Sequence, residues 1–188
     1  MTQNSRREHL IDTAITLFQQ RGYHATGIDK ILAHAHVSKK TMYQHFRSKE
    51  ELIYAALRKY DSQFRNSFMK EIKNRSHIPA EQLLILFDVA EDWFKADKFY
   101  GCMFISAVSE FATDDSTIRQ ICKQFKQLIH HYILTLAQEA NLSNPNEIAD
   151  ELSLLLEGAI VTAQVSSKPN AAQTAKHIAK QLIQNQTK

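Results

Sequence analysis

The residues from Thr26 to Lys49 constrain the fold of this 188-residue chain more than any other stretch. They contain two short helical patterns, and neither is long enough to bury its apolar residues alone. The first is predicted from apolar side chains at helical spacing, namely Ile28, Ile31, Leu32 and Ala35. Ser38 is typical of an N-cap and predicts a second helix from Lys39 to about Phe46. Two helices joined by a turn of three or four residues form a helix-turn-helix, here over about residues 27–46.

Thr26 stands at the predicted start of the first short helix, where an N-cap residue is expected. Together with Asp29, three residues later, it fits a capping box in which Asp replaces the usual Glu. We therefore expect the Thr26 side chain to cap this helix.

The second short helix presents polar side chains and none of them is acidic. They are cations, hydroxyl groups, an amide and an imidazole. These side chains are Lys39, Lys40, Thr41, Tyr43, Gln44 and His45. Such groups pair with the phosphate oxygens and base edges of DNA. A merely solvated basic face is the simpler alternative, but a capped helix-turn-helix makes DNA binding the better interpretation. Met42 and Phe46 are expected to point into the core instead.

The sequence VSKKTMYQHFRSKEEL, from Val37 to Leu52, closely resembles the end of the DNA-binding domain in TetR/AcrR-family transcriptional regulators. The dense resemblance covers roughly residues 7–57. It implies that two groups contact double-stranded DNA: phosphate-binding Thr26, Tyr43, His45 and Lys49, and a base-facing set of Lys39, Lys40, Thr41 and Gln44 with the cap residue Ser38. The chain departs from the family at Lys40 and at His36, where most members have Gly in a turn that needs positive φ. Positive φ is less favourable in free energy for His than for Gly. The turn is therefore expected to form with a modest loss of stability.

The composition favours an all-α fold, because only four glycines and three prolines accompany 44% hydrophobic residues. Pro79, Pro145 and Pro169 each stand where a helix is expected to begin. About nine helices are expected. A three-helix DNA-binding domain is assigned to residues 4–64, and a helical bundle for ligand binding and dimerisation to residues 65–188. A long helix that Ser48 caps is expected to run from the first domain into the second.

The positive charge of the chain is concentrated at its N-terminal end. Residues 1–49 contain eight Lys or Arg and three acids, whereas the remainder carries a net charge of −2 out of a total of +3. This is the charge distribution of a DNA-binding head on a neutral body. No apolar run approaches the ~18 residues of a membrane span, and the polar N-terminus lacks a signal peptide. Cys102 and Cys122 form no C-x-x-C pair, so we expect a cytoplasmic protein without a membrane partner.

The C-terminal bundle is expected to hold an unidentified small-molecule effector, as the resemblance implies. Five aromatic residues are candidates for lining its cavity, although the same spacing also fits an ordinary core: Phe68, Trp93, Phe104, Phe125 and Tyr132. The resemblance further implies a homodimer through the last two helices. Their small residues would permit close helix approach, but an intramolecular core could use them equally well.

The sequence therefore indicates a DNA-binding transcriptional regulator, expected to be a repressor that an effector releases from a palindromic operator. An effector-independent regulator or activator stays open, as does a thiol-based redox or electrophile sensor through Cys102. The nine histidines lack the Glu-x-x-His signature of di-iron bundles, so we expect neither a metal site nor a cofactor. No catalytic constellation is present, and we do not expect an enzyme.

Overall fold

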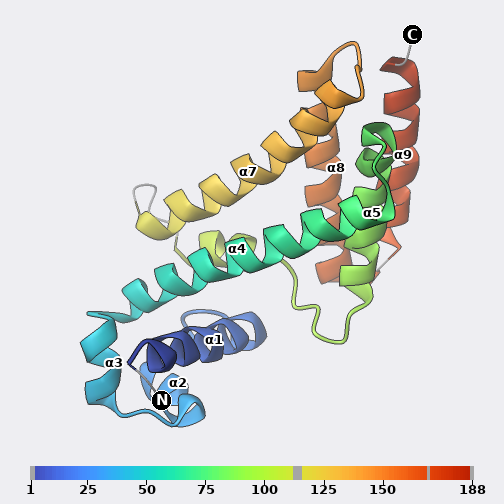
Figure 1. The fold of residues 1–188 in the computed structure, drawn as a ribbon. Helices are drawn as coiled ribbons and strands as arrows, with labels where there is room; N and C mark the ends of the chain where they lie inside the picture. Colours follow the sequence, from blue (N-terminus) through green and yellow to red (C-terminus); the bar gives the residue numbers. More distant parts are fainter. Residues whose placement is uncertain (1–2, 112–115, 169, 187–188) are drawn as a thin grey trace. The chain divides into compact units, whose positions relative to one another are not determined.

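The computed structural model describes residues 3–111, 116–168 and 170–186 of the chain (Figure 1). Within these residues the chain forms nine α-helices and no strand, which confirms the all-α prediction. The helices are α1 (Gln3–Arg21), α2 (Ile28–Ala35), α3 (Lys39–His45), α4 (Lys49–Arg75), α5 (Pro79–Lys95), α6 (Met103–Glu110), α7 (Thr117–Glu139), α8 (Pro145–Ser166) and α9 (Ala171–Gln186).

The described residues pack as two compact units. The first consists of residues 1–63 with 103–125, and the second of residues 64–102 with 126–188. Helices α4 and α7 contribute residues to both. The first unit thus includes α6 and the start of α7 besides the N-terminal helices. The functional division between residues 64 and 65 stays a prediction.

The first unit buries an apolar core beneath α1, α2 and α3. Tyr23 stacks on Phe18 with ring centroids 4.9 Å apart, and both side chains are at most 2% exposed. Lys59 of α4 binds two carboxylates of α1, at 2.8 Å to Glu8 and 2.6 Å to Asp12. These ion pairs fix α1 against the first half of α4.

Helix α6 is attached to the turn after α1 within the same unit. The Glu110 carboxylate accepts hydrogen bonds from the backbone N–H groups of Tyr23 at 2.9 Å and His24 at 2.6 Å. Gly22 has φ of +80°, and a Cβ atom there would meet the same carboxylate at 2.7 Å. Glycine therefore serves both the backbone conformation and the close approach of Glu110.

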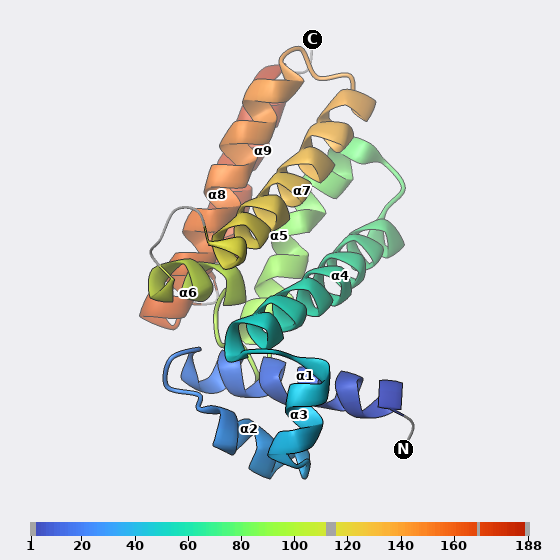
Figure 2. The same ribbon diagram turned by 90° about the vertical axis from the view of Figure 1, so that its left-hand side faces the viewer.

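The second unit is built on α5, α8 and α9, which pack against one another (Figure 2). Lys176 of α9 binds both carboxylate oxygens of Asp88 on α5, at 2.7 and 2.6 Å. Pro79 and Pro145 stand at the first positions of α5 and α8, as the sequence predicts. The corresponding prediction for Pro169 falls outside the described residues. None of the helices in the described ranges is both long and apolar enough to cross a membrane.

Candidate DNA-binding site

Helix α2 begins without the side-chain cap that the sequence indicates. Its N-cap residue is Gly27, which makes no side-chain cap hydrogen bond. Thr26 is fully buried, and its hydroxyl donates to the Gly22 carbonyl at 2.7 Å. The capping-box prediction for Thr26 is therefore wrong, because the hydroxyl bonds backward to the preceding turn. A side chain without exposed surface cannot reach a phosphate in this conformation, so Thr26 is left out of the proposed interface.

The turn between α2 and α3 has the strained conformation that the sequence predicts. His36 has φ 52° and ψ 42°, in the left-handed region. The backbone N–H groups of His36 and Val37 both donate to the carbonyl of Leu32, so the end of α2 is capped by the turn itself. A non-glycine residue here costs free energy, which these two hydrogen bonds offset.

Helix α3 is fixed by a side-chain cap at its start and by burial of one face. The Ser38 hydroxyl accepts a hydrogen bond from the Thr41 backbone N–H at 3.1 Å, which confirms the predicted cap. Met42 and Phe46 are at most 1% exposed, as expected. The guanidinium of Arg7 lies 5.2 Å from the centre of the Phe46 ring. Because these contacts define which side of α3 is inward, they also define the side that faces solvent.

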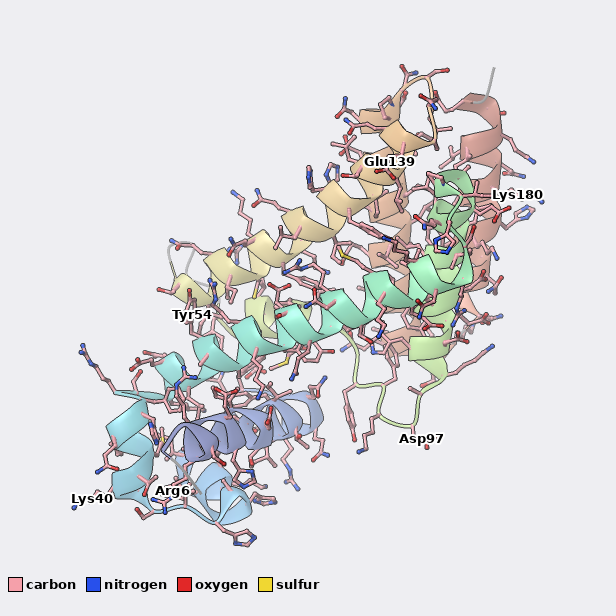
Figure 3. All side chains as sticks on the ribbon, viewed as in Figure 1. Arg6, Lys40, Tyr54, Asp97, Glu139 and Lys180 are labelled. Atoms are coloured by element: carbon pink, nitrogen blue, oxygen red, sulfur yellow. The ribbon has the colours of Figure 1, made fainter. Side chains whose placement is uncertain are left out.

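The outward side of α3 carries the polar residues singled out in the sequence. Lys39, Lys40, Tyr43 and Gln44 are exposed, and Figure 3 shows Lys40 pointing away from the helix. Thr41 and His45 are half-buried. Among the described residues no carboxylate forms an ion pair with Lys39 or Lys40. Two cations, a phenol and an amide are thus available to an external partner.

Lys49 is the first residue of α4, four positions after the end of α3. The Ser48 hydroxyl accepts from the Glu51 N–H at 3.1 Å, and the Glu51 carboxylate accepts from the Arg47 N–H at 2.6 Å. This pair confirms the predicted cap by Ser48 and resembles a capping box in which the Glu51 carboxylate bonds the N–H of Arg47 rather than that of Ser48. Burial lowers the pKa of Lys49, and the charge of Glu110 partly offsets that effect. Lys49 is half-buried, whereas Lys39, Lys40, Tyr43 and Gln44 of α3 are exposed.

The residues that the sequence assigned to a ligand cavity belong to both units. Phe104 and Phe125 stack on each other in the first unit, with centroids 3.8 Å apart, and both are at most 4% exposed. Phe68, Trp93 and Tyr132 belong to the second unit. Their role in ligand binding stays a prediction.

Cys102 is 4% exposed, and burial usually makes a thiol inert, but the Lys126 ammonium lies 3.7 Å from its sulfur atom. The role of Cys102 as a redox or electrophile sensor therefore stays a prediction. Among the described residues, no group of three or more His, Cys, Asp or Glu could hold a metal ion.

Sequence reasoning missed the residues that hold the helix-turn-helix in place from a distance. Glu110 binds the backbone of residues 86 and 87 positions earlier in the chain. Lys59 reaches α1 from 47 and 51 positions away. No local sequence pattern indicates such long-range contacts. Only the opposite charges of Lys59 and of the two acids on α1 could have suggested the ion pairs between α4 and α1.

A capped helix-turn-helix with an exposed, acid-free second helix defines a DNA-binding protein of the helix-turn-helix class. Comparison with known proteins agrees and is more specific. The sequence model for "Bacterial regulatory proteins, tetR family" matches residues 10–56. This match, together with the relatives and solved structures below, supports a DNA-binding transcriptional regulator of the TetR family.

Curated relatives resemble the chain over most of its length. The Escherichia coli (strain K12) regulator YjdC is 23% identical over 178 residues, which cover 94% of this chain and 93% of that protein. IcaR of Staphylococcus aureus, a negative regulator of the biofilm operon, is 25% identical over 90% of each chain. The activator FasR of Mycolicibacterium smegmatis is 45% identical over 60 residues, or 32% of this chain and 27% of its own length. These relatives are regulators and not enzymes.

Solved structures share the fold over nearly the whole chain. SCO4454, a TetR-family regulator from Streptomyces coelicolor, superposes with a TM-score of 0.89 at 24% identity, over 98% of this chain and 97% of that one. The reduced form of Escherichia coli NemR gives a TM-score of 0.85 at 22% identity, over 94% and 96% of the two chains.

Proposed function

We propose that this protein is a homodimeric, cytoplasmic repressor that a small-molecule effector releases from a partly palindromic operator. The observation that carries the proposal is the exposed face of α3, fixed by the Ser38 cap and the buried Met42. Repression is the role that the name of IcaR gives to that relative, over 90% of this chain. Its transfer to this chain is part of the proposal.

The exposed and half-buried residues of α3 divide into two proposed roles. Lys39, Lys40, Thr41 and Gln44 are proposed to face the bases, where an amide can bond adenine and a lysine can bond guanine. Tyr43, His45 and Lys49 are proposed to contact phosphates, which position the protein but carry no sequence information. The Ser38 hydroxyl, which caps α3, lies at the same end as the two lysines.

The proposed dimer forms through α8 and α9, and regulators of this family usually act as dimers. On α8, Leu154, Val161 and Val165 are 75%, 42% and 78% exposed, at a spacing that places them on one helix face. Gly158 belongs to the same stripe, and a Cβ atom there would meet nothing within 4 Å. Ile178 of α9 is 39% exposed as well. Covering such residues stabilises a dimer by ~25 cal/mol per Å² of apolar surface.

Two copies related by a twofold axis would present two recognition helices to one duplex. Half-sites for such a pair lie about one helical turn apart, or ~34–36 Å. Symmetry of the protein therefore implies near-symmetry of the operator.

Helix α4 supplies the proposed connection between effector and DNA. It is continuous over 27 residues and has Lys49, a proposed phosphate contact, at its first position. An effector that changes the tilt of α4 would alter the spacing of the two recognition helices. Release follows only if the effector prefers the state that cannot bind DNA, because equal affinity for both states shifts nothing.

An effector-independent activator is the second candidate function. The 60 residues shared with FasR at 45% identity support it, because that relative is a transcriptional activator. The match covers only 32% of this chain and 27% of FasR, so the support is weaker than that from the relatives that match over most of the chain.

A mobility-shift titration with the DNA upstream of the protein's own gene tests the proposal. We expect a specific shift that weakens with salt, because phosphate contacts release counterions. Loss of the shift on addition of a small molecule would support effector-controlled release. Absence of any specific shift across several salt concentrations would contradict regulation at that site, and a shift insensitive to a broad set of metabolites would favour the second candidate.

A further inference from the structure

A pocket of about 440 Å³ opens in the second unit, away from the helix-turn-helix. It lies between the last turns of α4, the start of α5 and the last two turns of α7. Figure 3 labels Glu139 at the end of α7, one of its lining residues. The volume falls within the range of small-molecule sites, ~300–1,000 Å³.

The lining of this pocket combines two lysines and one carboxylate, that of Glu139, with apolar surface. Lys70 and Lys73, one turn apart on α4, are both exposed. Met69 from the same helix is half-buried, and Leu136 from α7 is 3% exposed. Charge at the rim and apolar surface within are the features that an amphipathic ligand requires.

The positive charge of the two lysines is available to a ligand. Among the described residues, no ion pair joins Lys70 or Lys73 to a carboxylate. Arg75 differs, although it lies on the same helix, because Glu71 and Asp92 hold its guanidinium at 2.9 and 2.7 Å. Within the described residues, the chain thus pairs Arg75 with two carboxylates and leaves the two lysines outside any ion pair, and the Glu139 carboxylate is the one acidic group in the pocket lining.

Tyr132 contributes a hydrogen-bond donor to the same pocket. Burial, with a smaller contribution from the charge of Glu139, raises the pKa of its phenol above the ordinary 10.0. The phenol therefore keeps its proton at neutral pH and can donate to an oxygen atom. The hydroxyl of Thr135 already donates to the His131 carbonyl at 2.9 Å.

We propose that this pocket binds an amphipathic organic anion, a small carboxylate with an aliphatic or aromatic tail. Lys70, Lys73 and the Tyr132 phenol bind the carboxylate, and Met69 and Leu136 contact the tail. The assignment of this anion as the effector rests on the proposed function. A ligand wedged between α4 and α7 acts on the helix that begins at Lys49.

Isothermal titration calorimetry with three eight-carbon probes tests the ligand class. Octanoate is the anion, octanol the neutral analogue and octyltrimethylammonium the cation. We expect octanoate to bind at least tenfold more tightly than octanol, and the cation not to bind. Tenfold corresponds to about one charge-assisted hydrogen bond. Equal affinity for all three probes, or no octanoate binding at millimolar concentration, would overturn the proposal.

Substitutions locate the binding of octanoate. The double variant Lys70→Gln/Lys73→Gln should weaken octanoate at least tenfold and leave octanol unchanged. Thr135→Phe should weaken both probes by filling the pocket. Lys98→Gln is the matched control, because Lys98 is exposed and lies outside the lining. Octanoate affinity that is the same in the double variant and the wild type would overturn the site.

DNA binding, measured separately, distinguishes this proposal from the proposed function. Calorimetry detects the pocket without DNA, so a protein that fails to bind any operator contradicts the proposed function alone. Release of DNA by octanoate in the wild type but not in the double variant would support the effector assignment. Octanoate that binds at the pocket without changing operator affinity would overturn that assignment.

Discussion

The phenol of Tyr23 donates a hydrogen bond to the main-chain oxygen of Met103, 80 residues further along the chain, at 2.9 Å and away from solvent. Met103 is the first residue of α6, and Glu110, which binds the Tyr23 and His24 N–H groups, is the last. Both ends of α6 therefore hold the turn after α1. A displacement of α6 would therefore move or release Tyr23 and His24, the residues that lead into the helix-turn-helix.

Tyr23→Phe should lower the free energy of unfolding by about 0.5–1.5 kcal/mol, because the buried hydrogen bond from the phenol to the Met103 carbonyl would be lost. Urea denaturation followed by circular dichroism measures the change. Tyr54→Phe is the matched control, since its hydroxyl makes an exposed 3.3 Å contact with Arg58. That substitution should change stability by less than about 0.5 kcal/mol. Equal effects of the two substitutions would show that the Tyr23 hydrogen bond contributes nothing particular.

His36→Gly should stabilise the protein by up to about 1 kcal/mol, because glycine adopts the left-handed conformation of φ 52° without strain. The gain is limited by the larger conformational entropy of glycine in the unfolded chain. His36→Ala should destabilise the protein instead. Thermal unfolding of the three proteins gives the order, and an alanine variant more stable than the glycine variant would contradict this account of the turn.

The ion pair between Glu8 and Lys59 should make stability depend on pH in the acid range. The hydrogen bond from Lys59 lowers the pKa of Glu8 below its ordinary 4.5, against the opposing effect of burial. Its contribution is therefore complete above that ordinary value and is lost as the pH falls through the lower pKa of the folded state. Glu8→Gln should be less stable than the wild type at pH 7, with a difference that narrows toward pH 3.

Melting temperatures of the two proteins from pH 3 to pH 7 test this pH dependence. Glu50→Gln serves as the control, because Glu50 is exposed on the first turn of α4. Its difference from the wild type should not narrow in the same way. A Glu8→Gln difference that stays constant over the whole range would contradict the pairing.

Leu154→Asp should convert the proposed dimer to a monomer that remains folded, because Leu154 is 75% exposed in the single chain and a charge buried in the interface is costly. Sedimentation velocity gives the mass, and circular dichroism confirms the helix content. The control is Ile78→Asp, a substitution of another exposed apolar residue, at the N-cap of α5. A Leu154→Asp protein with the same sedimentation coefficient as the wild type would exclude an interface at this face.

Local features of the fold could be predicted from the sequence because their causes lie within a few residues. Ser38 and Ser48 cap the helices that follow them, and His36 takes the positive φ expected of the turn. Thr26 shows the limit of such patterns. Its hydroxyl could either accept from a following backbone N–H or donate to a preceding carbonyl, and the sequence does not distinguish the two hydrogen bonds.

Long-range contacts could not be predicted, because they depend on how distant helices pack. Nothing near Glu110 in the sequence indicates that it binds Tyr23 and His24. The aromatic residues show the same limit, since no local pattern indicates that Phe104 and Phe125 stack on each other. The basic residues of α3 could be found because charge and exposure leave a local signature.

Selection of binding sites from a random duplex library, with the wild type and Gln44→Ala, tests the central claim most directly. Gln44 is exposed on α3 and carries a proposed base contact. We predict that the wild type selects a partly palindromic motif with half-sites one helical turn apart, and that Gln44→Ala loses its preference at one base pair in each half-site. Such a contact corresponds to about 1–3 kcal/mol of discrimination. Identical motifs from the two proteins, or no motif from the wild type, would contradict the reading of DNA by α3.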